Sequence, residues 1–304
     1  MPTGARSITG PGRLTSNCRD MLSSGAMRLL LSDVDGTLVT KEKVLTEDAK
    51  AAVRALRDAG VGLTVTSSRP AFGMRMLVEP LELQLPLFGF NGGVVVNPDM
   101  SVIQTLAIDP HAAQQVVDLF MKQGVDVWVY GETQWFVRDA QAPHVVREAW
   151  ILKTEPVVTP AFTARHLERA IKIVAVSDDP ALIAATQKAA DDLLGGAASA
   201  TRSADYFIDV THPQANKGAV VGTLARMLAI PAAQIATIGD MPNDVLMFRQ
   251  SGLSVAMGNA SDEVKAQASA VTDSNENDGF AKAVRSFILP QAAPLPSAQP
   301  SRRP

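Results

Sequence analysis

The residues with the clearest chemical potential are carboxylates that follow apolar runs. The segment MRLLLSDVDGTLVT, residues 27–40, passes through leucines into Asp33 and Asp35, and Gly36 follows. The segment IATIGDMPND, residues 235–244, also ends an apolar run with Asp240 and then Asp244. Carboxylates that converge on one low-dielectric edge repel one another unless a cation lies among them. The sequence therefore predicts a cation site built from two distant segments.

Further polar residues extend this set toward phosphate chemistry. Ser67 with Ser68 and Asn91 follow other apolar runs, and Lys217 opens a predicted helix near the same edge. All-oxygen ligands without cysteine or histidine suit a hard ion, and Mg²⁺ is the expected one. Mg²⁺ usually shares its site with a phosphate, which Lys217, Ser67 and the backbone N–H groups of residues 33–36 would bind.

Two aspartates so close together can perform two tasks. A carboxylate that binds the metal and faces the phosphate can attack phosphorus and form an aspartyl-phosphate. A second carboxylate, further round the turn, can protonate the leaving oxygen and later deprotonate water. Gly36 permits the sharp turn that brings Asp35 back over the site. Each motif alone also suits a solvated loop, so the functional interpretation depends on their shared position at one sheet edge.

A parallel α/β sheet is the element that must position these residues. The apolar runs 28–33, 61–68 and 235–240 have the pattern of strands buried on both faces, and further strands are expected within 253–260 and 268–272. Thr46 is expected to cap a helix that Gly60 ends, with Ala49, Ala52, Val53 and Leu56 facing inward. A second helix is expected at 217–228, with Val220, Leu224, Met227 and Leu228 facing inward. Strand, helix and strand in succession predict a right-handed crossover, with ligands at the carboxyl ends of the strands.

The middle of the chain differs in texture and predicts an inserted α+β domain. All three tryptophans and both tyrosines lie within residues 111–212. The segment VDVWVYGETQWFV, residues 125–137, predicts a β-hairpin. Helices are expected at 144–152, 164–171 and 180–194, and strands at 171–176 and 205–210. We assign a core to residues 27–108 and 209–289, an insert to 109–208, and disorder to 1–26 and 290–304.

Composition excludes several classes of function. The chain has 304 residues, 46% hydrophobic and 19% charged, and a formal charge of -3 that offers no basic field to nucleic acid or to an anionic membrane. No run approaches the roughly 18 apolar residues that span a bilayer. The single cysteine, Cys18, excludes an intramolecular disulfide and a cysteine-based metal site. We expect a cytoplasmic protein with a small-molecule partner, and no oligomeric state is predicted.

The ordered motifs resemble those of the haloacid dehalogenase-like superfamily. DVDGT (33–37), TSSRP (66–70), Lys217 and GDMPND (239–244) look like its four motifs. FNGG (90–93), VAMGNA (255–260) and VTDSNENDGF (271–280) resemble its Cof-type phosphatase branch. The resemblance covers residues 27–288. It implies a Rossmann-like core, a large α/β cap inserted between the second and third motifs, and a Mg²⁺-dependent phosphohydrolase.

The resemblance also implies a role for each site residue. Asp33 matches the nucleophile and Asp35 the acid/base, while Asp33, the backbone carbonyl of Asp35 and Asp240 match the metal ligands. The phosphate-binding positions are Ser67, Lys217 and Asn243, and the supporting positions are Thr37 and Asp244. Many relatives have Thr-Gly-Arg where this chain has Ser67-Ser68-Arg69. Ser67 keeps the hydroxyl of the threonine, so it can still contact phosphate. Ser68 replaces the glycine, and its side chain narrows the space in which the backbone approaches the phosphate. The presence of Asp35 favours phosphate-ester hydrolysis over dehalogenation.

The cap is expected to cover the site, exclude water and contact the leaving group. Candidate contacts for a sugar or a small ring are Trp128, Tyr130, Trp135, Arg138 and His144. Aromatics that alternate in a hairpin more often pack the core of a small domain, and that interpretation is the stronger one for each. The expected substrate is a small phosphorylated metabolite such as a sugar phosphate. A phosphomutase or phosphotransferase acting on sugar phosphates, and a non-catalytic metal-dependent binding protein, are the alternatives.

Overall fold

The computed structural model describes residues 26–292. The predicted disordered segments lie outside these residues, except for their inner ends. Residues 290–292 are structured: the 3₁₀ turn η7 covers Leu289–Gln291, and Ala292 forms a β-bridge with Met27. The backbone N–H of Met27 donates to the carbonyl of Gln291 at 2.7 Å. This pairing beside the first strand corrects the predicted start of the tail.

A five-stranded parallel sheet, in the order β14-β13-β12-β1-β2, carries both acidic segments. Its strands are β1 (Leu29–Ser32), β2 (Gly62–Val65), β12 (Ile235–Gly239), β13 (Leu253–Ala256) and β14 (Ala270–Val271). Strand β1 is an interior strand and pairs with β2 and β12 in parallel. Successive side chains point to opposite faces, so Leu30 joins one apolar cluster while Leu29 and Leu31 join another. Helices cover both faces, which explains the continuous apolar pattern of β1.

The helices over this sheet are α2 (Glu47–Asp58), α7 (Lys217–Leu228), α8 (Val245–Phe248), α9 (Asp262–Lys265) and α10 (Gly279–Ala283). Helix α2 has the predicted Thr46 cap, which accepts a hydrogen bond from the N–H of Ala49, and the predicted buried face. Helix α7 has the predicted bounds, and Val220 and Leu224 of the predicted stripe are buried, with Leu228 packed against the same cluster. Met227 is 43% exposed instead, and Lys217 is buried on the inward side with its Nζ against the carboxylates at the sheet edge.

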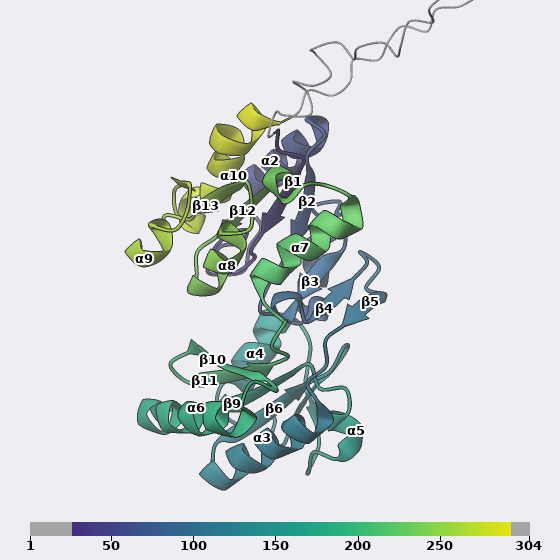
Figure 1. Ribbon diagram of the computed structural model, residues 1–304, viewed down its shortest axis with the longest axis vertical. Coiled ribbons are helices and arrows are strands. Elements are labelled where there is room, and N and C mark those ends of the chain that lie inside the picture. Colours follow the sequence, from purple (N-terminus) through teal and green to yellow (C-terminus); the bar gives the residue numbers. More distant parts are fainter. Residues whose placement is uncertain (1–25, 293–304) are drawn as a thin grey trace, which may run out of the picture.

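Shorter turns complete this part of the chain. The 3₁₀ turns are η1 (Ala71–Leu77), η2 (Phe90–Gly92), η3 (Ala232–Gln234), η4 (Pro242–Asp244) and η5 (Asn275–Asn277), and η6 (Val284–Ile288) is a π-helical turn. A small antiparallel sheet of β3 (Leu87–Gly89), β4 (Val94–Val96) and β5 (Val102–Thr105) leads the chain from the first large sheet toward the second (Figure 1).

The second large sheet has six strands in the order β10-β11-β9-β6-β7-β8. They are β6 (Asp126–Tyr130), β7 (Trp135–Val137), β8 (Val157–Val158), β9 (Lys172–Val176), β10 (Ser199–Ala204) and β11 (Phe207–Thr211). The predicted hairpin is confirmed as β6 and β7. Its helices are α3 (Pro110–Gln123), α4 (Val145–Leu152), α5 (Ala164–Leu167) and α6 (Pro180–Leu194). Helix α3 and strand β10 were not predicted, and α5 is shorter than expected.

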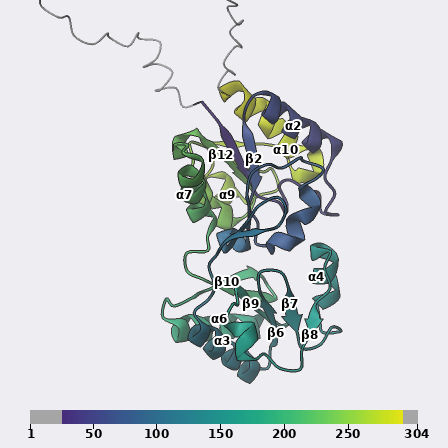
Figure 2. The ribbon, with the colours of Figure 1, turned by 90° about the vertical axis from the view of Figure 1, so that its right-hand side faces the viewer.

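The two faces of the second sheet differ in what they contact. Helices α3 and α6 cover the face that points away from the first sheet (Figure 2). On the other face, Trp128 and Tyr130 of β6 join the same apolar cluster as η1 and α4. This sheet with its helices therefore lies against the core as a cap. Within residues 26–292, no helix is long and apolar enough to cross a membrane.

Candidate active site

Three buried carboxylates meet at the carboxyl ends of β1 and β12. Asp33, Asp240 and Asp244, hereafter the acidic triad, each offer an oxygen within 4.8 Å of the others. All three are buried, with exposed fractions of 4%, 8% and 0%. Strands β1 and β12 are hydrogen-bonded neighbours, so the two acidic segments come together as predicted from their strand ends.

Lys217 balances part of this negative charge. Its Nζ donates to Asp33 Oδ1 and to Asp244 Oδ1, both at 2.6 Å. Burial would lower the pKa of Lys217, but the charges of Asp244 and Asp33 outweigh it and raise that pKa. The lysine is therefore a fixed cation. The Asn216 side chain caps α7 by accepting from the N–H of Ala219, which begins the helix at this lysine.

The two carboxylate oxygens of Asp244 are not available as free ligands. Asp244 Oδ2 accepts from the backbone N–H groups of Asp240 and Met241, both at 2.9 Å. Since Oδ1 already binds Lys217, both oxygens of Asp244 are engaged. Asp244 therefore holds Lys217 and the turn after β12 in place, and Asp33 and Asp240 remain as the carboxylates that can bind a cation.

The chemistry of Asp33 and Asp240 fits a divalent cation. Asp33 Oδ2 is buried and has no hydrogen-bond partner among the described residues. Burial raises the pKa of Asp33 well above its usual value; Lys217 opposes this rise, and Asp244 and Asp240 add to it. Burial, and then the charge of Asp244, raise the pKa of Asp240 to about 6. A Mg²⁺ ion bound by these two oxygen donors would compensate the negative charge that Lys217 leaves.

The side chain of Asp240 is held by neighbours from two other segments. Thr37 Oγ1 donates to its Oδ1 at 3.2 Å, and Asn259 Nδ2 donates to its Oδ2 at 3.0 Å. Asn259 also donates to the Gly36 carbonyl at 2.9 Å, so it ties the turn after β1 to the turn after β12. Asn259 is not among the predicted site residues, although it lies in the VAMGNA segment. Gly36 has φ +79°, and an added Cβ would lie 2.3 Å from Asp240 Oδ2.

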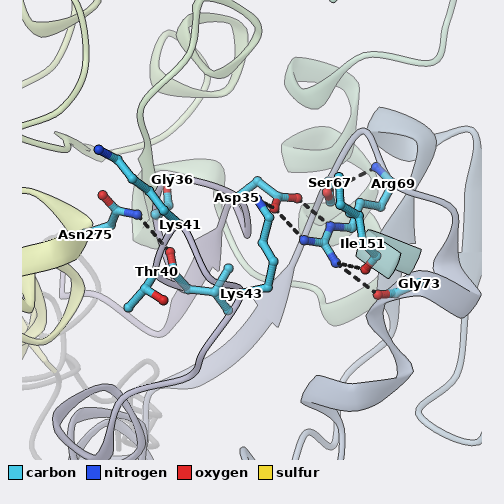
Figure 3. Close-up of polar contacts among 12 residues, drawn as sticks. Asp35, Gly36, Thr40, Lys41, Lys43, Ser67, Arg69, Gly73, Ile151 and Asn275 are labelled. Carbon is cyan, nitrogen blue, oxygen red and sulfur yellow. Dashed lines mark hydrogen bonds and ion pairs between the residues drawn. The ribbon is translucent and has the colours of Figure 1, made fainter. Parts of the chain in front are cut away.

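Asp35 lies in a cationic clamp beside the triad. Arg69 donates to its two oxygens from Nε at 2.6 Å and Nη2 at 2.5 Å, and Lys43 Nζ donates to Oδ1 at 2.6 Å (Figure 3). Burial would raise the pKa of Asp35, but Arg69 and then Lys43 offset it and hold that pKa below its usual value. Arg69 Nη1 also donates to the carbonyl of Ile151 in α4, at 3.0 Å. The clamp thus joins Asp35 to the cap.

The remaining predicted phosphate-binding residues lie around this edge. Ser67 is buried, and its Oγ accepts from the N–H of Arg69 at 3.1 Å. Asn243 Nδ2 donates to Asn91 Oδ1 at 3.2 Å, while Asn243 Oδ1 is buried with no partner in the described part of the chain. Asn91 and Asn243 line a pocket of about 160 Å³ between core and cap. Its core side is formed by Ser68, Phe90, Asn91, Asn216, Lys217, Asn243 and Leu246, and its cap side includes Lys172, Ser199, Thr201, Asp209 and Thr211.

The five cap residues expected to contact substrate do not line this pocket. Trp128, Tyr130 and Trp135 are at most 1% exposed, and Tyr130 stacks on Trp135 at 5.6 Å between ring centroids. They fill the interface with η1 and α4, which is the packing role given above as the stronger interpretation. Arg138 lies 4.0 Å from Asp126, and His144 contacts Asp178 at 2.7 Å and stacks on Tyr206.

The chain is similar to known hydrolases over most of its length. Residues 30–284 match the sequence profile of the haloacid dehalogenase-like hydrolases. A 5-amino-6-(5-phospho-D-ribitylamino)uracil phosphatase of Bacillus subtilis is 26% identical over 88% of this chain and 100% of its own. A haloacid dehalogenase-like hydrolase from Bacteroides thetaiotaomicron superposes with a TM-score of 0.79, at 23% identity over 85% of this chain and 98% of the other. A phosphatase of the same superfamily from that organism reaches 0.74, at 26% identity over 92% and 100%.

Proposed function

Since the chain belongs to the haloacid dehalogenase-like hydrolase family, we propose that it is a Mg²⁺-dependent phosphatase of small phosphorylated metabolites, sugar phosphates in particular. The observation that carries this proposal is the difference between the contacts of the two carboxylate oxygens of Asp33. One of its oxygens is fixed by Lys217, and the other is buried and has no partner within residues 26–292. The division into a core and a cap, and a cytoplasmic location, belong to the same proposal. The predicted boundary after residue 208 moves to 211, because β11 (Phe207–Thr211) pairs with β9 and β10 in the second sheet, so the cap covers 109–211 and the core 27–108 and 212–289.

Asp33 is the nucleophile in this proposal. Its carboxylate oxygen attacks phosphorus, a P–O bond forms to Asp33, and the P–O bond to the leaving group breaks. Lys217 keeps the carboxylate oriented through its 2.6 Å contact and, with Asn243 and Ser67, offers hydrogen bonds to the phosphoryl oxygens. Mg²⁺ bound by Asp33, Asp240 and the backbone carbonyl of Asp35 would neutralise phosphoryl charge.

Asp35 is the general acid and base in this proposal. With Arg69 and Lys43 in contact it is ionised, which suits the second step, in which a carboxylate takes a proton from the water that attacks the aspartyl-phosphate. To protonate the leaving oxygen in the first step, Asp35 must first bind a proton itself. The clamp of Arg69 opposes this, so we expect the first step to require a looser contact between Arg69 and Asp35.

Release of inorganic phosphate from a panel of phosphorylated metabolites, with Mg²⁺ and with EDTA, tests the function. We expect release from a few sugar phosphates that stops in EDTA and is abolished in Asp33→Asn. Asp192→Asn is the control, because Asp192 is exposed on α6 and, within residues 26–292, forms an ion pair with Lys188 alone. Turnover that persists in Asp33→Asn, or equal release in EDTA, would contradict the mechanism. Phosphoryl transfer between sugars with little release would favour a phosphomutase.

A further inference from the structure

A buried ion pair lies on the cap side of the pocket. Lys172 of β9 and Asp209 of β11 come from neighbouring antiparallel strands, and Lys172 Nζ lies 3.0 Å from Asp209 Oδ2. The two side chains are only 11% and 9% exposed. A buried ion pair contributes little net stability, because desolvating both charges offsets their attraction. Its presence in an otherwise apolar pair of strands is therefore a reason to look for a ligand.

One carboxylate oxygen of Asp209 is free to accept a hydrogen bond. Its Oδ1 is buried and has no hydrogen-bond partner within the described chain, although the residue is 94% buried. An unpaired buried carboxylate oxygen is costly, and a donor from a ligand would remove that cost. Asp209 lines the same pocket as Lys217 and Asn243. A group attached to a phosphate at Asp33 would extend toward it.

The charges around the pair disfavour a second anion. Lys172 is already paired with Asp209, and its Nζ lies 5.4 Å from the ring of Tyr130, whose hydroxyl donates to Glu148 at 3.0 Å. One lysine among two carboxylates leaves no net positive charge for a second phosphate or a carboxylate. The free acceptor requires an O–H or N–H donor instead.

The pocket also lacks a surface on which a planar ring would stack. Among the described residues that line it, Phe90 is the single aromatic one, and it is 1% exposed because it packs against Tyr130. Hydroxyls are supplied by Ser199, Thr201 and Thr211. The volume of about 160 Å³ is close to that of a cavity which holds a ring of six carbons. The lining suits a short chain of hydroxyl-bearing carbons.

We propose that Lys172 and Asp209 select the leaving group, and that this group is a neutral polyhydroxylated carbon chain, a sugar or a sugar alcohol. Asp209 Oδ1 accepts a hydrogen bond from one hydroxyl, and Lys172 Nζ, which has three donors, donates to the oxygen of a neighbouring one. This inference rests on the proposed phosphatase function and adds the residues and the hydrogen bonds that distinguish among substrates.

The test compares two esters of equal carbon length, D-sorbitol 6-phosphate and n-hexyl phosphate, by kcat/KM. We expect the unaltered protein to favour the sorbitol ester and Asp209→Asn, whose amide oxygen still accepts but carries no charge, to reduce that preference by about 10-fold, the difference between a charged and a neutral acceptor. The double variant Lys172→Met/Asp209→Leu removes both charges without leaving either unpaired, and because it also removes the acceptor it should reduce the preference by about 10- to 100-fold. Asp192→Asn, which breaks an exposed Lys–Asp pair on the same cap, should keep the preference.

The possible outcomes distinguish a failure of this inference from a failure of the proposed phosphatase function. Hydrolysis of both esters at equal rates by the unaltered protein, or an equal loss for both esters in Asp209→Asn, keeps the phosphatase and overturns the role of the pair. A preference for fructose 1,6-bisphosphate over fructose 6-phosphate would overturn the neutral leaving group. Phosphate release from none of these four esters would refute the proposed function itself. If thermal unfolding shows that the Asp209 variants do not fold, Thr211→Val is the deciding variant. A reduced preference for the sorbitol ester, by less than the loss expected for Asp209→Asn, supports the site, and an unchanged preference overturns the proposal.

Discussion

Gly36→Ala is a sharp test of how the turn after β1 positions Asp240. Gly36 has φ +79°, so alanine there is strained, and its Cβ would lie 2.3 Å from Asp240 Oδ2. An ordinary contact begins at 3.4 Å, so the carboxylate must retreat by about 1 Å. A displacement of that size in a catalytic group can lower the rate about 100-fold. We expect kcat/KM for phosphate release to fall by that factor.

Gly124→Ala is the matched control. Gly124 ends α3 with φ +77°, and an added Cβ would have nothing within 4 Å. Both variants therefore lose about 1–2 kcal/mol of unfolding free energy to backbone strain, but only Gly36→Ala also crowds a carboxylate. Because Asp240 accepts from Thr37 and Asn259, Gly36→Ala loses a further 1.5–3 kcal/mol or so for each of these bonds that breaks.

Urea unfolding of both variants, with Mg²⁺-dependent phosphate release measured in parallel, separates the two effects. We expect Gly124→Ala to keep its activity and Gly36→Ala to lose it. Gly36→Ala should also need a higher Mg²⁺ concentration for its half-maximal rate, since a displaced Asp240 is a weaker ligand. Equal activity in the two variants would refute the view that this contact sets the position of Asp240.

Three further outcomes follow from the charges. Mg²⁺ should raise the thermal unfolding midpoint, since an ion that Asp33 and Asp240 bind only in the folded state adds about 2.7 kcal/mol at 100 times its Kd; an unchanged midpoint would argue against the metal site. Lys217→Met should abolish phosphate release and lower the unfolding free energy by about 3–5 kcal/mol in urea, because two buried carboxylates lose their partner. Burial raises the pKa of Glu148, with Lys172 and Tyr130 opposing the rise. The folded state therefore binds the Glu148 proton more tightly than the unfolded state does, and the protein loses stability as pH rises through the raised pKa. Glu148→Gln should therefore be more stable than the unaltered protein at pH 7 and gain nothing below about pH 4; equal stability at pH 7 would contradict this.

The position of the triad was predictable because it depends on short-range rules. Parallel strands end at a common edge, so residues that follow β1 and β12 had to approach one another once both strands were identified. Lys217 was predictable as the first residue of a helix that starts at this edge. Most of the face of α7 was predictable as well, since Val220 and Leu224 are buried and only Met227 of the predicted stripe is exposed. The burial of Lys217 was not part of that stripe, because it depends on ion pairs with carboxylates from other elements.

The cap side of the site was missed for a different reason. Lys172 and Asp209 are single charged residues in apolar strands, and that interruption was the available signal. Their pairing depends on the register of β9 with β11, which no local pattern specifies. The aromatic residues had the right period for a hairpin, but period does not reveal that α4 and η1 cover their face. For the same reason the contact of Arg69 with Ile151 could not be predicted.

The position of β1 between β2 and β12 has a consequence for how the chain is made. Strand β1 meets β2 soon after both leave the ribosome, whereas its other neighbour, β12, begins at Ile235. The six strands of the cap are complete by Thr211, so the cap can close while one edge of β1 is still bare. Such an edge is a template for pairing with another chain. A stalled or truncated product that ends before Ile235 would therefore be a folded cap joined to two of the five strands of the first sheet. It would be prone to aggregation, and it would lack Asp240 and Asp244, the residues that lie beside Asp33 and Lys217 in the complete chain.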